Sequence, residues 1–214
     1  MNNNESTFVY AVRHGETEWN SMGKQQGHMD SPLTALGTKQ AYALAIGLMN
    51  RGIELIISSD LGRASKTAEI IAAKLKLSVT TNELLRERHL GSLQGLTIDE
   101  WHKKYPNEWS VYKSGDPDYC FPNGESARQR YERAIKCVEA LAEQYKGNVI
   151  LIVTHGGILS GMFYRAIGLP LSAPRRFSLF NASINSFSIS RNFWKLCTWG
   201  ETHHLQGMET LDDN

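Results

Sequence analysis

Cysteine is scarce in this sequence. Its 214 residues include three cysteines, Cys120, Cys137 and Cys197, which are odd in number and far apart along the chain. Such spacing does not suggest a disulfide framework, which needs an even number, or a zinc site, which needs closely spaced pairs. We therefore favour a reducing compartment.

The sequence also lacks an excess of charge of either sign. Lys and Arg number 23 and Asp and Glu number 22, which gives a formal net charge of +1. A chain of this kind has no broad basic surface of the sort that drives non-specific nucleic-acid binding, so we expect no nucleic-acid partner. Any preference for an anion must come from a local group of side chains.

Long apolar runs are missing as well. The first residues, MNNNESTFVYAV, have no positively charged segment before their short apolar run, and no later segment is long and apolar enough to cross a bilayer. We expect a soluble cytoplasmic protein with no membrane partner. With 41% hydrophobic residues the chain can bury an ordinary core, and we expect one domain over residues 1–214.

Three short apolar segments are present, and each ends in residues that carry chemistry. They are residues 8–12 before Arg13 and His14, residues 54–58 shortly before Arg63, and residues 148–153 before His155. Continuous β-branched and aliphatic runs are typical of strands buried on both faces, as in a parallel sheet covered by helices.

Segments with helical spacing alternate with these strands, at residues 34–52, 63–77, 125–147 and 157–168. This alternation predicts an α/β fold, specifically a three-layer α/β/α sandwich with a mostly parallel central sheet. Residues 176–199 alternate polar and apolar side chains around Arg191 and Asn192, which predicts a C-terminal β-hairpin at a sheet edge. Residues 101–124 hold three prolines and show no clean period, so we expect a loop-rich lid insertion there.

The chemistry-bearing residues are expected to meet at one rim. In open α/β sheets ligands bind beyond the carboxyl ends of the strands, where Arg13, His14, Arg63 and His155 would lie. Guanidinium groups bind phosphate oxygens bidentately, and an imidazole among them can attack phosphorus to form a phosphohistidine. The pattern therefore indicates a site for a phosphoryl group.

Two further features fit this chemistry. Gly156 and Gly157 begin a predicted helix, whose free N–H groups and dipole favour an anion. An acid is also needed for the leaving oxygen, and Glu87, in the stretch LLRERHLGSLQG, is a candidate. To donate a proton near neutral pH, this carboxyl group would need a raised pKa, which burial and the phosphate favour and the nearby arginines oppose.

Four motifs in order, RHGETEWN, SSDLGRASKTAE, LRERHLGSLQG and VTHGG, resemble those of the histidine phosphatase superfamily, in the branch that holds phosphoglycerate mutases and related phosphatases. The resemblance runs from about Val9 to Ser183. It implies a catalytic site without metal or cofactor, in which His14 is the nucleophile and Glu87 the proton donor. It further implies that His155 completes the catalytic group, that Arg13, Asn20, Arg63 and Gly156 bind phosphate, and that Thr17 and Gln26 line the entrance.

Each residue also has a structural interpretation when taken alone. His14 fits a helix-capping or core histidine, Arg63 fits a capping residue at a helix start, and Glu87 between two arginines fits a solvated ion pair. The aromatic residues of 101–124 fit lid packing better than a ligand cage. For four residues the sequence does not decide between contact with substrate and a structural role in a loop: Arg86, Arg88, His28 and Arg128.

Phosphatase and mutase share this pocket and differ in whether water or a second hydroxyl accepts the phosphoryl group. The stretch between Glu87 and His155 is shorter than in cofactor-dependent mutases of this family, and a more open pocket admits water. We therefore expect a phosphatase acting on a small-molecule phosphate ester. The alternatives are a 2,3-bisphosphoglycerate-dependent phosphoglycerate mutase and a non-catalytic module that binds phosphorylated ligands. The C-terminal hairpin leaves open whether the protein is a homodimer.

Overall fold

The computed structural model describes residues 6–191 and 193–212, which form a six-stranded sheet with strand order β3-β2-β4-β1-β5-β6. At its centre, β1 (Thr7–Arg13) pairs in parallel with β4 (Val149–Thr154) and antiparallel with β5 (Ile184–Ser190). On the other side of β4 lie β2 (Leu55–Ser58) and β3 (Val79–Thr81), both parallel to it. The antiparallel edge strand is β6 (Phe193–Glu201), so the sheet is mostly parallel, as predicted.

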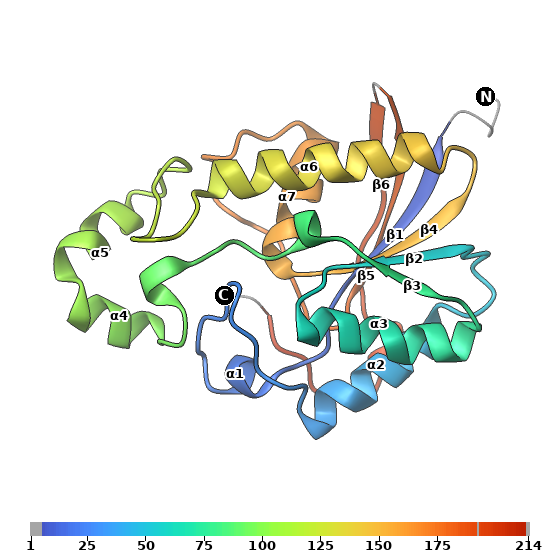
Figure 1. The fold of residues 1–214 in the computed structure, drawn as a ribbon, viewed down its shortest axis with the longest axis horizontal. Coiled ribbons are helices and arrows are strands. Elements are labelled where there is room, and N and C mark those ends of the chain that lie inside the picture. The colour runs from blue at the N-terminus through green and yellow to red at the C-terminus, as the bar shows by residue number, and fades with distance from the viewer. Residues whose placement is uncertain (1–5, 192, 213–214) are drawn as a thin grey trace.

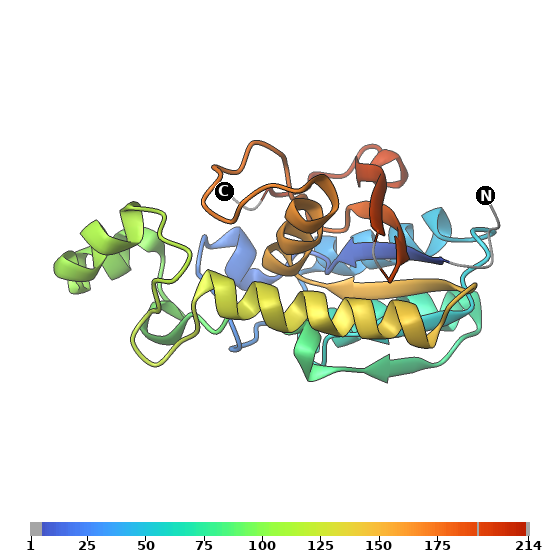
Figure 2. The same cartoon turned by 90° about the horizontal axis from the view of Figure 1, so that it is seen from above.

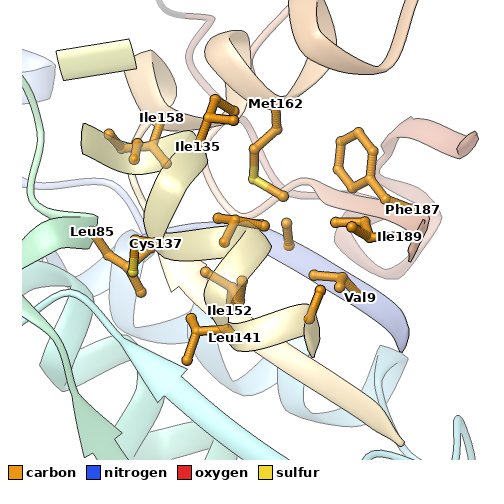
Figure 3. Close-up of a cluster of buried hydrophobic side chains, with 14 of the residues drawn as sticks. Val9, Leu85, Ile135, Cys137, Leu141, Ile152, Ile158, Met162, Phe187 and Ile189 are labelled. Carbon is orange, nitrogen blue, oxygen red and sulfur yellow. The ribbon is translucent and has the colours of Figure 1, made fainter. Parts of the chain in front are cut away.

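Helices cover both faces of this sheet. In Figure 1, α6 (Ala127–Gln144) and α7 (Gly156–Ile167) lie above the sheet, while α2 (Ala35–Gly47) and α3 (Gly62–Leu75) lie below it. Neighbouring strand residues supply the two cores, because side chains alternate across a strand. Val9 packs with α6 and α7 in the cluster drawn in Figure 3, whereas Val12 packs with α2 and α3. The predicted three-layer sandwich is confirmed.

The predicted hairpin is present, but it begins later than expected. Residues 176–183 are irregular, and the paired strands run over Ile184–Ser190 and Phe193–Glu201. Of the two residues predicted to turn, Arg191 follows β5 directly and Asn192 lies outside the described residues.

The segment predicted to be loop-rich, residues 101–124, is irregular over 114–124, but its first half is helical. Two helices were not expected there, α4 (Ile98–Lys104) and α5 (Pro106–Lys113). Local sequence signals explain where both helices begin. Thr97 and Glu100 form a capping box at the start of α4, and Pro106 occupies the first turn of α5, where a missing N–H breaks no helical hydrogen bond. Both helices project beyond one end of the sheet (Figures 1 and 2). We call residues 90–124 the cap.

The cap has a small core of its own, separate from the two clusters against the sheet. Leu93, Trp101 and Phe121 are buried together in it, and the surrounding aromatic residues pack against them. The expectation that these aromatic side chains serve packing is therefore confirmed.

Across residues 6–191 and 193–212, no helix combines the length and apolar character that a membrane crossing requires. The cellular location and the single-domain boundary at 1–214 stay predictions.

Two glycines fix how β1 meets α2. A Cβ on Gly15 would overlap the carbonyl oxygen of Gly37, and a Cβ on Gly37 would overlap the carbonyl oxygen of Glu16. The contact is held by hydrogen bonds, since Gln40 Oε1 accepts from Glu16 N at 2.8 Å and Thr34 N donates to Glu16 O at 3.0 Å. The first turn of α2 thus supports the loop that follows His14.

Replacing Gly37 with alanine tests this contact. In an unconstrained helix, Gly→Ala stabilises by about 1 kcal/mol, but here overlap with Glu16 O should destabilise the protein by about 1–3 kcal/mol instead. Urea unfolding of Gly37→Ala and of Lys39→Ala, an exposed position two residues later in α2, measures the difference. Equal midpoints for the two variants would contradict the contact.

Candidate active site

The carboxyl ends of β1, β2 and β4 meet at one rim of the sheet, and the site is built there. Arg13 ends β1 in register with Thr154, and His14 N donates to Thr154 O at 3.0 Å. The rings of His14 and His155 consequently lie with centroids 5.3 Å apart and planes at 62°. The structure brings together the two imidazoles that the sequence placed in distant motifs.

His14 is held in one tautomer. Its side chain is 3% exposed, and Nδ1 lies 2.8 Å from the carbonyl oxygen of Gly15. A carbonyl only accepts hydrogen bonds, so Nδ1 carries the proton and Nε2 carries the lone pair. Arg63 Nε donates to that lone pair at 3.2 Å. Burial, followed by the charges of Arg63 and Arg13, holds the His14 pKa well below its usual 6.5, so the ring is neutral at neutral pH.

His155 packs edge-on against His14 and is 1% exposed. Its Nε2 is 2.8 Å from Ser59 Oγ, which also accepts from Leu61 N at 3.3 Å. The arrangement that satisfies the serine proton has Ser59 donating to Nε2, which leaves the His155 proton on Nδ1. This Nδ1 is buried and has no hydrogen-bond partner among the described residues. Burial, followed by the charges of Arg63 and His14, also lowers the His155 pKa well below 6.5.

The two guanidinium groups predicted to bind phosphate are fixed by the protein. Arg63, the second residue of α3, donates to Asp30 Oδ1 at 2.7 Å, to Gly27 O at 2.8 Å and to Met29 O at 3.0 Å. Arg13 donates to the carbonyl oxygen of Leu179. Because these bonds orient both groups before a ligand arrives, little side-chain entropy is lost on binding.

Glu87 occupies the N-terminus of α7. Its Oε2 accepts from Gly157 N at 2.8 Å and its Oε1 accepts from Arg88 N at 2.7 Å. A Cβ at position 157 would overlap Glu87 Oε1, so a larger residue there would displace the carboxylate. The sequence predicted that the Gly156-Gly157 helix start would favour an anion, and the anion found there is the Glu87 carboxylate.

A cavity of ≈ 200 Å³ opens between these groups. Seven of the nine predicted site residues line it: Arg13, His14, Asn20, Gln26, Arg63, Glu87 and Gly156. His155 is not among its lining residues, although its ring contacts that of His14.

Thr17 differs from the expectation that it lines the entrance. Its side chain is fully buried and caps α1 (Glu18–Ser21), where Oγ1 accepts from Asn20 N at 3.2 Å. The same oxygen accepts from Gln26 Nε2 at 2.8 Å. Thr17 therefore positions two residues of the cavity wall and does not itself face the cavity.

Sequence reasoning missed several lining residues, among them Lys24 and Arg130. Lys24 follows the first motif by four positions, which was an available signal, whereas nothing in the sequence indicates that the start of α6 returns to this rim. Of the four residues left open, Arg88 lines the cavity. His28 Nε2 lies 2.8 Å from Glu87 O, Arg86 pairs with Asp60, and Arg128 pairs with Asp118 at the surface.

The cavity lining is a poor donor set for a cation, because it holds one carboxylate among several cationic groups. Among residues 6–191 and 193–212, no three His, Cys, Asp or Glu side chains gather in a way that could hold a metal ion.

Comparison with known proteins places this site in context. The model of the histidine phosphatase superfamily (branch 1) matches residues 9–202. The phosphoglycerate mutase-like protein 4 of Arabidopsis thaliana is 39% identical over 202 residues, which cover 92% of this chain and 86% of the relative.

Solved structures of similar proteins superpose on most of this chain. Bacillus stearothermophilus YhfR superposes with a TM-score of 0.84 at 30% identity, covering 92% of this chain and 98% of that one. A mycobacterial glucosyl-3-phosphoglycerate phosphatase solved with VO3 superposes with a TM-score of 0.80 at 28% identity, covering 91% and 99%.

The buried histidines make stability depend on pH. Since the native state holds the pKa values of His14 and His155 below 6.5, the unfolded chain binds protons that the native state does not as pH falls below 6.5. The stabilisation is complete above that pH and decreases below it, by up to about 1.4 kcal/mol per pH unit for each group. Urea unfolding between pH 7.5 and 5 should therefore show a smaller loss in His155→Gln than in the wild type.

His102→Gln serves as the control, because His102 is exposed on α4 and should leave the pH dependence unchanged. A wild-type slope in His155→Gln would contradict the burial of a neutral ring.

Proposed function

This chain belongs to the histidine phosphatase superfamily, and from that premise we propose that it is a phosphatase that hydrolyses small phosphorylated metabolites through a phosphohistidine on His14. The observation that carries the proposal is the state of His14: a neutral ring whose Nε2 lone pair lies at a cavity lined by Arg13, Arg63 and Glu87. Family membership and phosphatase neighbours support the coarser statement that the protein is a phosphatase or a mutase.

In the first step, His14 Nε2 attacks phosphorus in line with the leaving oxygen. The Nε2–P bond forms while the ester P–O bond breaks, and its electron pair leaves with the alcohol oxygen, which takes a proton from Glu87. Arg13 and Arg63 hold the equatorial oxygens, where charge is spread in the transition state. His155, packed against the His14 ring with centroids 5.3 Å apart, would hold that ring in place for the attack.

In the second step, water attacks the phosphohistidine and Glu87, now a carboxylate, takes the water proton. The Nε2–P bond breaks, the electron pair returns to His14, and inorganic phosphate leaves. The same carboxyl group thus acts as acid and then as base, and no metal or cofactor enters either step.

A second candidate is a phosphoglycerate mutase, which the name of the Arabidopsis relative favours. In that reaction a hydroxyl of a bound phosphorylated acid, and not water, accepts the phosphoryl group. Supplying 3-phosphoglycerate with and without 2,3-bisphosphoglycerate and following 2-phosphoglycerate against free phosphate distinguishes the two.

His14→Ala should abolish turnover of p-nitrophenyl phosphate in chelator, by about 10³-fold or more, because His14 is the only imidazole among the described residues that line the cavity. Circular dichroism checks that the variant folds. Labelled ester, quenched under alkaline conditions that preserve phosphohistidine, should label the wild type and not the variant. A silent wild type across several esters would instead support a binding module, and an active His14→Ala would refute the nucleophile.

Glu87→Gln should show a loss that depends on the leaving group. p-Nitrophenolate is stable without a proton, whereas an alkoxide is not, so formation of the phosphoenzyme should slow by about 10²-fold or more for glycerol 3-phosphate and much less for p-nitrophenyl phosphate. Rapid-quench measurement of the first step checks this. Equal losses on both esters would remove Glu87 from the role of proton donor.

A further inference from the structure

The main chain of Glu87 is held by side chains from distant parts of the sequence. Its carbonyl oxygen lies 2.8 Å from Nε2 of His28, in the segment between α1 and α2, and 3.3 Å from Nη2 of Arg133, on α6. We propose that His28 is a positioning residue, which holds Glu87 where its carboxyl group protonates the leaving oxygen. This inference rests on the proposed function and adds to it a residue that is not among those lining the cavity.

The hydrogen bond from His28 to Glu87 has a fixed direction. A carbonyl oxygen only accepts, so the proton of the His28 ring lies on Nε2. Nε2 carries a proton in this neutral tautomer and in the imidazolium ion alike, so the ring donates to Glu87 O in both states. The support for Glu87 therefore does not depend on the charge of His28.

Neighbouring groups fix the His28 ring itself. The backbone N of His28 donates to Gln94 Oε1 at 2.7 Å. The ring packs edge-on against His89, with centroids 4.7 Å apart and planes at 77°. His89 is held in turn, because its backbone N donates to Glu125 Oε1 at 3.0 Å. A ring that is constrained at its main chain and on one side fixes the position of the atom it contacts, the carbonyl oxygen of Glu87.

His28 also connects Glu87 to the nucleophile. The carbonyl oxygen of the preceding residue, Gly27, accepts a hydrogen bond at 2.8 Å from Nη2 of Arg63, whose Nε donates to His14 Nε2 at 3.2 Å. The proton donor and the nucleophile are therefore both held against one short segment. In an in-line reaction these two groups act on opposite sides of phosphorus, so the distance between them must match the substrate. A shift of about 1 Å in such a geometry costs up to about 100-fold in rate.

Arg133, the other donor to this carbonyl oxygen, has a broader role. It also donates to Leu84 O at 2.7 Å and to Arg86 O at 3.0 Å. Its removal would free several main-chain groups at once, whereas a neutral imidazole has a single N–H, and the N–H of His28 points to Glu87 O. His28 is therefore the position at which the support for the proton donor can be changed with the least disturbance elsewhere.

The test separates an effect on Glu87 from a general loss of structure. His28→Leu removes the donor at similar side-chain size, and His28→Gln restores an N–H group that can reach Glu87 O. In His28→Leu, formation of the phosphoenzyme, measured by rapid quench, should slow by about tenfold on an alkyl ester, glycerol 3-phosphate or 3-phosphoglycerate, whose leaving alkoxide needs a proton. On p-nitrophenyl phosphate it should slow by less than about twofold. The loss should appear in the limiting rate of that step and not in the substrate concentration that half-saturates it, and His28→Gln should regain most of it.

A double variant shows whether His28 acts through Glu87. Adding His28→Leu to Glu87→Gln should slow the first step on the alkyl ester by less than about twofold beyond Glu87→Gln alone, because the group that His28 positions is already lost. His102→Leu is the matched control, because this ring is exposed on α4 and its loss should leave the rates on both esters unchanged. Circular dichroism and urea unfolding check that each variant folds. His28→Asn, whose side chain is too short to reach Glu87 O, replaces His28→Leu if that variant does not fold.

Failure of this inference and failure of the proposed function give different results. If His28→Leu slows both esters equally, leaves both unchanged, or still slows the Glu87→Gln variant by about tenfold, His28 is not a positioning residue for Glu87 and the phosphatase stands. If the wild type hydrolyses neither p-nitrophenyl phosphate nor an alkyl ester, the proposed function itself fails and the inference falls with it.

Discussion

The hydrogen bond from His14 Nδ1 to the carbonyl oxygen of Gly15 is the interaction on which the rest of the site depends. It fixes the proton on the nitrogen that faces the protein, and so leaves the lone pair on Nε2, beside Arg63. Burial and two guanidinium groups disfavour a second proton. In the proposed reaction this neutral, oriented ring would attack a phosphate dianion, and the charges that depress its basicity would also bind the phosphate.

The start of α7 also determines where a functional group lies. Its N-terminal N–H groups and dipole favour negative charge, and Glu87 supplies that charge through Gly157 N. The helix therefore positions the carboxyl group at the wall of the cavity.

Much of this arrangement could be predicted from the sequence, because parallel strands bring their carboxyl ends to one edge whatever their separation in the chain. Arg13, His14, Arg63 and His155 each follow a continuous apolar run, and that pattern alone placed them together. The predictions that failed concern which way individual side chains point and which path a helix takes. Thr17 stands within the first motif but points inward to cap α1, and Arg130 reaches the rim only because of the path that α6 takes. The helices of 98–113 were not predicted, because the aromatic and proline residues there show no helical periodicity. The capping signals at Thr97 and Pro106 were therefore overlooked.

The cap keeps its buried aromatic residues apart from the two clusters that hold the sheet. Arg88 joins the cap to the rest of the protein, since its Nη2 donates to Tyr119 O at 2.6 Å and its Nε donates to Glu125 O at 2.8 Å. In a fold divided in this way, residues of the cap can change without disturbing the packing around the two imidazoles at the rim of the sheet.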